Sequence, residues 1–417
     1  RSFLKLLGAG AGAAGALYGC AGVAPKMEIM PTTSRRVVVI GGGYGGTIVA
    51  KYIRMNDPGI EVVLIERNKQ FISCPFSNLV IGGVLKDLSS LTISYDKLAS
   101  NHGIKMVYDE VSAIDPVGKF VTVGSGSIRY DRLVVSPGID FRFEEIEGYN
   151  AMETPKVIPH AWKAGDQTLL LRKQLEAMPD GGTVVMTIPL APYRCPPGPY
   201  ERTNMIAWYL KNNKPKSKII ILDANPDVTS KGALFKKGWA KHYTGIVDYR
   251  SAKKVTQVNA KSMMVTVEGI EDIKGDVINL IPPQRAGAIA VKAGLVGPDK
   301  NWCPVNPTTF ESTIHKDIHV IGDAALTGAM PKSGYSANSE AKVCAVNIVA
   351  LMNGRETMEL SGINTCYSFI TNKEAVSVSG VYKVADGKII AVPNSGGVSP
   401  DLSELEGIYA ESWIKNI

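Results

Sequence analysis

Several signatures are missing from this sequence of 417 residues, and each absence excludes a class of protein. The six cysteines form no C-x-x-C pair, which excludes the common zinc spacings and leaves no C-x-x-C-H haem site on this chain. No run of about 20 strongly apolar residues occurs, so the sequence predicts no transmembrane helix. Aromatic residues make up only 7% and the basic residues form no block, so we expect no nucleic-acid groove despite a net charge of +7.

The composition is that of a globular protein with large cores. Hydrophobic residues make up 45% of the chain and charged residues 20%. The length suggests two or three domains, and no repeat of solenoid period is present. We therefore expect distinct domains, with the excess charge serving solubility or a surface for an acidic partner.

The first strong motif is a glycine-rich turn between a strand and a helix. Val37–Ile40 is a continuous apolar run, as in a buried parallel strand, and Thr47–Arg54 has a helical pattern. The turn between them carries three glycines in the G-x-G-x-x-G pattern, namely Gly41, Gly43 and Gly46. A second strand at Val62–Ile65 ends at Glu66, 20 residues after the last glycine. This context predicts a dinucleotide site, with the pyrophosphate on the helix N-terminus and Glu66 on the ribose hydroxyls.

Two later segments extend this pattern. Tyr130–Gly138 ("YDRLVVSPG") is a strand that ends in small residues, and Asp317–Ala325 ("DIHVIGDAA") is a buried strand that ends in Gly322 and Asp323. An acid at the carboxyl end of a parallel strand suits a hydroxyl of a flavin ribityl chain. Together with the first motif, these segments resemble the two-dinucleotide-domain flavoproteins of the disulfide reductase superfamily, which implies an α/β fold and FAD.

The resemblance implies a FAD-binding domain that is split in the sequence. The fold class is then α/β, with two Rossmann-like dinucleotide-binding-type domains and a C-terminal α+β domain. We expect an export signal and linker at 1–34, the FAD-binding domain at 35–150 and 276–350, a second Rossmann-like domain at 151–275, and a C-terminal pocket or interface domain at 351–417.

The second Rossmann-like domain lacks a glycine fingerprint. Its strand at Thr183–Ile188 leads into "PLAPYRCPPGP", whose prolines cannot donate an N–H to a pyrophosphate. A later strand at Lys218–Asp223 still ends in an acid, so we expect the domain shape to persist. The sequence therefore predicts that a soluble nicotinamide is not a partner.

Across nearly its whole length the chain resembles the flavoprotein subunits of flavocytochrome c sulfide dehydrogenases. The segments that carry the resemblance include "GGGYGG", "SCPFSNLVIGG", "RCPPGPYER", "DVINLIPPQRAG", "TFESTIHKDIHVIGDA", "MPKSGYSAN" and "NTCYS". The resemblance implies an enzyme that oxidises hydrosulfide to sulfur or polysulfide and passes the electrons to a c-type cytochrome subunit.

The resemblance also implies roles for three cysteines and one acid, although a cysteine is more commonly a buried, inert residue. It implies that Cys74 is bonded covalently to the flavin 8α-methyl carbon, and that Cys195 and Cys366 form a redox disulfide beside the flavin ring. Glu201, six residues after Cys195, is then a proton carrier. Hydrosulfide is a soft nucleophile and would open such a disulfide by exchange, which leaves a persulfide and a thiolate.

The sequence gives weaker indications for several other residues, and some of them have two interpretations. Lys332 stands where a helix N-terminus would face the flavin, and is either a charge at the cofactor or a plain surface lysine. Cys303 and Cys344 lie in apolar patterns that predict burial. The C-terminal tail has apolar helical spacing and would close the flavin pocket or meet the cytochrome. In it, Trp413 is either a packing anchor or a residue between flavin and haem.

The first twenty residues, "RSFLKLLGAGAGAAGALYGC", have the features of an export signal. Arg1–Lys5 matches the second half of a twin-arginine motif, and that route exports folded, cofactor-loaded proteins. We therefore expect a periplasmic protein, where disulfides are stable. "LYGC" resembles a lipoprotein cleavage box, so a lipidated Cys20 is one hypothesis for the mature N-terminus.

Three alternative functions stay open on the sequence. A sulfide:quinone reductase shares the fold and the cysteine chemistry but needs a membrane surface. A nicotinamide-dependent reductase would be reduced by NADH without sulfide. A non-catalytic flavoprotein scaffold for a cytochrome would work without the two redox cysteines.

Overall fold

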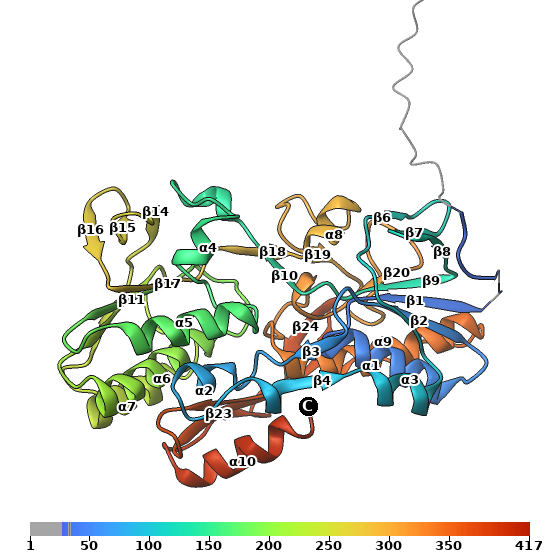
Figure 1. Ribbon diagram of the computed structural model, residues 1–417. Coiled ribbons are helices and arrows are strands. Elements are labelled where there is room, and N and C mark those ends of the chain that lie inside the picture. Colours follow the sequence, from blue (N-terminus) through green and yellow to red (C-terminus); the bar gives the residue numbers. More distant parts are fainter. Residues whose placement is uncertain (1–26, 32, 34) are drawn as a thin grey trace, which may run out of the picture.

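The computed structural model describes residues 27–31, 33 and 35–417. The export motif at Arg1–Lys5 and the lipidation hypothesis at Cys20 lie outside the described residues. The described chain forms two parallel sheets flanked by helices, one at each side of the molecule in Figure 1, and an antiparallel C-terminal sheet below them. The predicted α/β class, with two Rossmann-like domains and a C-terminal α+β domain, is confirmed.

The first parallel sheet has the strand order β20-β9-β1-β2-β5. Its central strand β1 (Arg36–Ile40) pairs with β2 (Glu61–Ile65) and β9 (Arg132–Val135). The outer strands are β5 (Lys105–Val107) and β20 (Ile318–Val320). Because β20 comes from a distant part of the sequence, this FAD-type domain is split along the chain, as predicted.

Helix α1 (Tyr44–Asn56) begins three residues before the predicted start at Thr47, and it packs against α9 (Gly334–Met352). The first turn contains glycines, which favour a loop when only sequence is considered. A Cβ on Gly46 would lie 1.8 Å from the carbonyl oxygen of Gly41, so this part of the helix has no room for a side chain. Close backbone packing therefore explains glycines inside the helix.

The second parallel sheet has the order β13-β12-β11-β17. Strands β11 (Thr183–Ile188) and β12 (Lys218–Asp223) have the predicted bounds, and β13 (Val247–Arg250) follows them. Strand β17 (Val277–Leu280) pairs in parallel with β11, so the second domain extends past the predicted boundary at residue 275. The sheet is flanked by the helices α5 (Asp166–Ala177), α6 (Gly198–Asn213) and α7 (Gly232–His242).

The C-terminal sheet is antiparallel and lies against both other domains. Its strands are β22 (Ser361–Phe369), β23 (Ala375–Ala385), β24 (Lys388–Ala391) and β25 (Gly397–Val398). The predicted helical tail is α10 (Glu404–Ile414), which packs on β23 beneath the sheet (Figure 1). Contacts of β22 with α6 and α9 place this sheet across the junction of the two Rossmann-like domains.

The remaining elements are short. The helices are α2 (Ser77–Ile81), α3 (Asp96–His102), α4 (Thr154–Val157), α8 (Ala288–Lys292), η1 (Ser89–Leu91), η2 (Phe143–Glu145) and η3 (Gly322–Ala324). The strands are β3 (Gln70–Ile72), β4 (Thr92–Ser94), β6 (Ala113–Asp115), β7 (Phe120–Val123), β8 (Gly126–Arg129), β10 (Ile139–Phe141), β14 (Val255–Asn259), β15 (Met264–Val267), β16 (Glu271–Lys274), β18 (Gln284–Ala286), β19 (Cys303–Pro304) and β21 (Ala325–Leu326).

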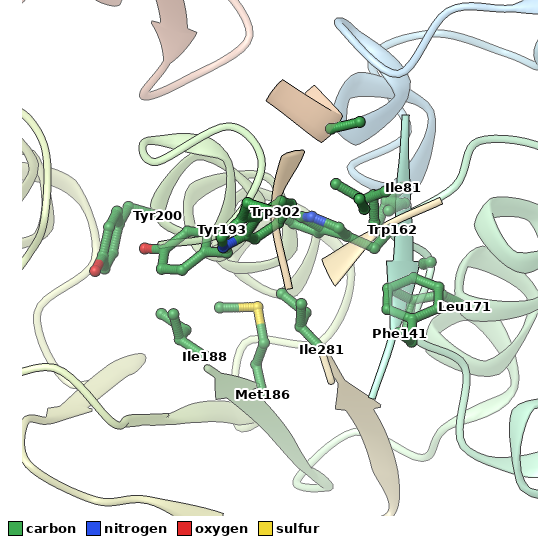
Figure 2. Close-up of a cluster of buried hydrophobic side chains, with 14 of the residues drawn as sticks. Ile81, Phe141, Trp162, Leu171, Met186, Ile188, Tyr193, Tyr200, Ile281 and Trp302 are labelled. Atoms are coloured by element: carbon green, nitrogen blue, oxygen red, sulfur yellow. The ribbon is translucent and has the colours of Figure 1, made fainter. Parts of the chain in front are cut away.

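A buried aromatic cluster joins the two Rossmann-like domains. Figure 2 shows Trp162, Tyr193 and Trp302 in a row above Met186 and Ile281 of the second domain. Full burial of a large apolar side chain stabilises a fold by about 1.5–3 kcal/mol, so this cluster holds the domains in a fixed relation. The predicted burial of Cys303 and Cys344 in the core is also confirmed.

Candidate functional site

A cavity of about 1340 Å³ lies where the three domains meet. Typical small-molecule pockets measure about 300–1000 Å³, so this one has room for an extended ligand. The first domain contributes the glycine turn, Glu66, Cys74 and Asp323; the second contributes Trp162, Arg194, Cys195 and Glu201; and the C-terminal domain contributes Cys366–Ser368 and Trp413. Segments that are far apart in the sequence therefore line the same cavity.

The glycine turn fits a pyrophosphate. Gly41 has φ +96°, and a Cβ there would lie 2.2 Å from the carbonyl oxygen of Ser136. Gly43 is the N-cap of α1 and supplies no capping side chain, so the helix N-terminus on the cavity wall is free to bind an anion. The bare turn and the helix dipole would suit a pyrophosphate, and the binding role of Gly41, Gly43 and Gly46 stays a prediction.

Glu66 is fixed at the end of β2. Its Oε2 accepts a hydrogen bond from the N–H of Gly42 at 2.8 Å, and its Oε1 accepts two from Asn68, each at 2.9 Å. The carboxylate thus stands beside the glycine turn and on the cavity wall, where a ribose would bind.

Asp323, which follows Gly322 in η3, lines the cavity and has one unpaired carboxylate oxygen. Its Oδ1 is buried and has no hydrogen-bond partner within the described part of the chain. Burial raises the pKa of Asp323, and the nearby charges of Arg194 and Lys332 oppose that rise. An unsatisfied buried carboxylate oxygen is costly, so this position fits a ligand hydroxyl.

Two indole N–H groups on the same wall also lack partners. The Nε1 atoms of Trp162 and Trp413 are buried and make no hydrogen bond to any described residue. The residues that line the cavity therefore include two with an unused donor and one with an unused acceptor. Together with the glycine turn, these groups fit FAD, a ligand with a pyrophosphate, a ribityl chain and a polar ring.

The ammonium of Lys332 is held by the loops around it. Its Nζ donates to the carbonyl oxygens of Asp323 and Ala325, at 2.8 and 2.7 Å, and lies 3.8 Å from the centroid of the Trp302 ring. It is not among the residues that line the cavity. Its own carbonyl accepts a hydrogen bond from the N–H of Cys195 at 2.7 Å. Because these contacts use the ammonium, the structure gives Lys332 a role in holding the loops of the site together.

Cys74 lies on the cavity wall between β3 and α2. Its Sγ accepts hydrogen bonds from the N–H of Ala164 at 3.3 Å and from Nη2 of Arg194 at 3.4 Å. These two donors, one of them a guanidinium, hold the sulfur in place on the cavity wall.

Cys195 and Cys366 line the same cavity from opposite domains. The structure describes both as free thiols, so the predicted disulfide between them stays a prediction. Burial raises the pKa of each thiol, and each thiol lies close enough to Glu201 and Lys231 for their charges to act on it. Cys195 has a left-handed backbone (φ +57°), and Cys366 lies on β22.

Glu201 lies in the first turn of α6 and is held by the other two domains. Its Oε2 accepts a hydrogen bond from Nδ2 of Asn78 at 2.7 Å, and its Oε1 accepts one from the N–H of Phe369 at 2.9 Å. Burial raises the pKa of this carboxyl group. A carboxyl with a raised pKa beside two thiols can hold a proton at a higher pH than an ordinary carboxyl does, and can exchange it with a neighbouring group.

Three cations at the site, of which Arg202 and Lys231 are buried and Arg194 is half-buried, were not predicted. Arg202 donates to Asn78 and to the carbonyl oxygens of His160 and Ala161, and its guanidinium lies 4.8 Å from the centroid of the Trp162 ring. Arg194 binds Cys74 and acts on Asp323. Both arginines lie in the same segment as Cys195, "RCPPGPYER". That segment is the feature of the sequence from which they could have been predicted. The third cation, Lys231, lies beneath β22, and no sequence motif marks it.

In the second domain, the acid that would bind a nicotinamide ribose already accepts hydrogen bonds from neighbouring residues. Asp223 ends β12, and its Oδ2 accepts hydrogen bonds from the hydroxyls of Tyr200 and Tyr249, at 2.8 and 2.9 Å. Its Oδ1 accepts two from Asn225, at 2.9 and 2.8 Å. Since a carboxylate accepts about four hydrogen bonds, Asp223 has no acceptor left for a nucleotide.

None of the helices in the described part of the chain combines the length and apolarity that a membrane crossing requires. Within the same residues, no group of His, Cys, Asp and Glu is arranged to hold a metal ion.

Family comparisons match three parts of the chain. The central domain of the sulfide dehydrogenase [flavocytochrome c] flavoprotein chain matches residues 168–282, and the flavin-binding domain of flavocytochrome c sulphide dehydrogenase matches residues 360–417. The pyridine nucleotide-disulphide oxidoreductase family matches residues 35–172.

Individual proteins agree with these matches. The flavoprotein chain of sulfide dehydrogenase [flavocytochrome c] from Chlorobaculum thiosulfatiphilum is 55% identical over 47 residues, which are 98% of that sequence and 11% of this chain. The mitochondrial sulfide:quinone oxidoreductase of Dictyostelium discoideum is 22% identical over 333 residues, covering 75% of this chain and 70% of that protein.

A solved structure shares the fold. The sulfide:quinone oxidoreductase of Aquifex aeolicus superposes with a TM-score of 0.73 at 19% identity, covering 92% of this chain and 90% of that chain. The fold, the flavin-fitting cavity and the family matches lead to one conclusion: the chain belongs to the flavocytochrome c sulfide dehydrogenase flavoprotein chains, a family of sulfide-oxidising flavoproteins.

Proposed function

We propose that this chain oxidises hydrosulfide to sulfur or polysulfide and passes the electrons, through FAD, to a c-type cytochrome on a partner subunit. The observation that carries the proposal is the shared cavity wall. Cys195, Cys366 and Glu201 lie on it together with the glycine turn and Asp323, which fit the cofactor.

The first step uses the two cysteines as a disulfide. Hydrosulfide attacks one sulfur, a new S–S bond forms, and the bond between Cys195 and Cys366 breaks. One cysteine becomes a persulfide and the other keeps the electron pair as a thiolate, so the single negative charge of hydrosulfide is conserved. Bound FAD supplies an acceptor for the electron pair and releases the electrons one at a time.

Glu201 manages the proton of this step. Its carboxyl lies on the cavity wall, and its charge acts on both thiols. As a carboxylate it can accept the proton that the persulfide loses, while Asn78 and the N–H of Phe369 hold it in place.

Cys74 is the proposed point of covalent attachment of the flavin, as the resemblance implies. The hydrogen bond from Arg194 holds the Cys74 sulfur on the cavity wall, where the flavin would bind. A thioether would keep the cofactor in place during export.

The electron acceptor distinguishes the two leading functions. Trp413 lines the cavity and stacks on Tyr335 with a centroid distance of 6.3 Å, and its helix carries the exposed side chains of Leu405, Ile408 and Tyr409. This surface supports docking of a redox protein near the flavin. The second candidate is a sulfide:quinone reductase, which the similarity to quinone-linked relatives favours.

The test is an anaerobic assay of the purified, flavin-loaded protein. We expect sulfide to reduce the flavin, and cytochrome c to reoxidise it faster than a soluble quinone does. Reoxidation by quinone with cytochrome c inert would establish the alternative. Flavin that sulfide does not reduce would overturn both.

We also propose that the protein works in the periplasm, with twin-arginine export and a lipidated Cys20 as the hypothesis for its anchor. Mass spectrometry of the mature N-terminus tests this, because an unmodified start beyond residue 24 excludes lipidation.

A further inference from the structure

Lys231 is a cation buried directly beneath the strand that carries Cys366. It precedes α7 and is only 6% exposed. Its Nζ donates to the carbonyl oxygen of Cys366 at 3.3 Å, to Oγ of Ser368 at 2.9 Å and to the carbonyl oxygen of Val376 at 3.4 Å. The ammonium is therefore tied to both strands of the β22–β23 pair.

All three of these acceptors are neutral. No carboxylate within the described residues forms an ion pair with Lys231, although burial of an unpaired charge is costly. Burial lowers the pKa of Lys231 to about 8. The groups that oppose this lowering are Cys366, Glu201 of α6, Cys195 and Glu406 of α10. Among the described residues, no carboxylate contacts the ammonium directly, so these groups balance its charge only from a distance.

The backbone at Lys231 adopts an unusual conformation for a lysine. Its φ is +56°, in the left-handed region that favours glycine or asparagine. The left-handed conformation is thus adopted by Lys231 and not by its neighbour Gly232. Lys231 therefore carries a long cationic side chain at a position where glycine or asparagine would be less strained.

The two thiols differ in their surroundings. For Cys366, Lys231 is the largest influence that opposes the effect of burial on the thiol pKa. For Cys195, the negative charges of Cys366 and Glu201 act more strongly than the cations Arg194 and Lys231. The site is therefore better prepared for a negative charge on Cys366 than on Cys195.

We propose that Lys231 is a positioning residue that acts as the built-in counter-ion for the thiolate of Cys366 when hydrosulfide opens the disulfide. This inference rests on the proposed function. Hydrosulfide bonds to Sγ of Cys195, the bond between Cys195 and Cys366 breaks, and Cys366 keeps the electron pair. One negative charge enters the buried site with the substrate, and the ammonium of Lys231 balances it on Cys366.

The test compares three variants at this position with the wild-type holoprotein. Lys231→Met removes the charge at similar length, and Lys231→Arg keeps it. Lys231→Asn also removes the charge and tolerates the left-handed backbone, so it gives the result if the Met variant does not fold. The matched control is Lys236→Met, an exposed lysine on the same helix that pairs with Asp227.

The main readout is the alkylation of Cys366 and Cys195 by iodoacetamide in the dithiol form, followed against pH by peptide mass spectrometry. Without the cation, we expect Cys366 to need a pH about one unit higher for the same rate, which is a tenfold loss at fixed pH. Lys231→Arg and Lys236→Met should keep the wild-type profile. Equal Cys366 profiles in wild type, Lys231→Met and Lys231→Asn would overturn the inference.

The second readout separates this inference from the proposed function. Flavin reduction by sulfide should slow about tenfold in Lys231→Met and recover in Lys231→Arg. If sulfide fails to reduce the wild-type flavin, the proposed function is wrong, whatever the alkylation shows. If the wild type reacts and the neutral variants match it in both readouts, only the role of Lys231 is wrong.

Discussion

The side-chain amide of Asn78 donates to the carboxylate of Glu201 at 2.7 Å, and so connects α2 of the first domain to the helix that follows Cys195. The N–H of Phe369 binds the other carboxylate oxygen from the C-terminal domain. Glu201 is therefore fixed by three domains at once, and its position depends on their correct assembly.

Replacement of Glu201 by Gln should remove the pH dependence of the rate at which sulfide reduces the flavin. Because burial raises the pKa of Glu201, the carboxylate form is lost as pH falls through that raised value, and flavin reduction by sulfide should slow on the acid side. Glu201→Gln should be slower by about 10²–10⁴-fold, without that acid limb. Stopped-flow absorbance against pH measures both effects, and an unchanged profile would remove Glu201 from the mechanism.

Replacement of either redox cysteine should abolish sulfide oxidation and leave the cofactor bound. Cys195→Ser and Cys366→Ser each remove a sulfur that the exchange step needs. Cys344→Ala, a buried cysteine of α9 outside the cavity, is the control. Anaerobic titration with sulfide measures the result. Turnover that survives in both serine variants would support the scaffold alternative instead.

Removal of the Cys74 thiol should release the flavin on denaturation. In the wild type we expect the flavin to stay with the precipitated chain after acid treatment, and in Cys74→Ala to appear in the supernatant. Fluorescence of the two fractions gives the distribution. Free flavin from the wild type would show that the attachment does not form.

Asp323→Asn should weaken FAD binding, because it removes the charge from a carboxylate whose Oδ1 is buried and unpaired. A hydrogen bond to a charged group contributes about 1.5–3 kcal/mol, so we expect binding weaker by one to two orders of magnitude. The measurement is FAD titration of the apoprotein in a Cys74→Ala background, which removes any covalent link. Asp227→Asn, an exposed aspartate, should bind FAD like the parent.

NADH should leave the flavin oxidised, since Asp223 already accepts hydrogen bonds from Tyr200, Tyr249 and Asn225. Anaerobic mixing with NADH, followed by sulfide as the positive control, tests this. Rapid bleaching by NADH alone would establish the nicotinamide-dependent alternative.

The parts of the site that the sequence could predict are those that depend on local order. The glycine turn, Glu66 and Asp323 are marked by neighbouring strands, and their places at strand ends follow from the topology of parallel sheets. The start of α1 was predicted too late because only close packing places glycines inside a helix. Lys231 could not be found, since its importance arises from the strand β22 packed above it.

The position of Cys366 has a consequence for the order of synthesis. A chain interrupted before Ser361 contains the glycine turn, Asp323, Cys74, Cys195 and Glu201, but it lacks the second thiol, the N–H of Phe369 and Trp413. Domains generally fold as they leave the ribosome, N-terminal parts first. The nascent protein therefore forms the glycine turn and the Asp323 strand end while the cavity is still uncovered, and residues translated after position 360 add Cys366 and complete the cavity wall.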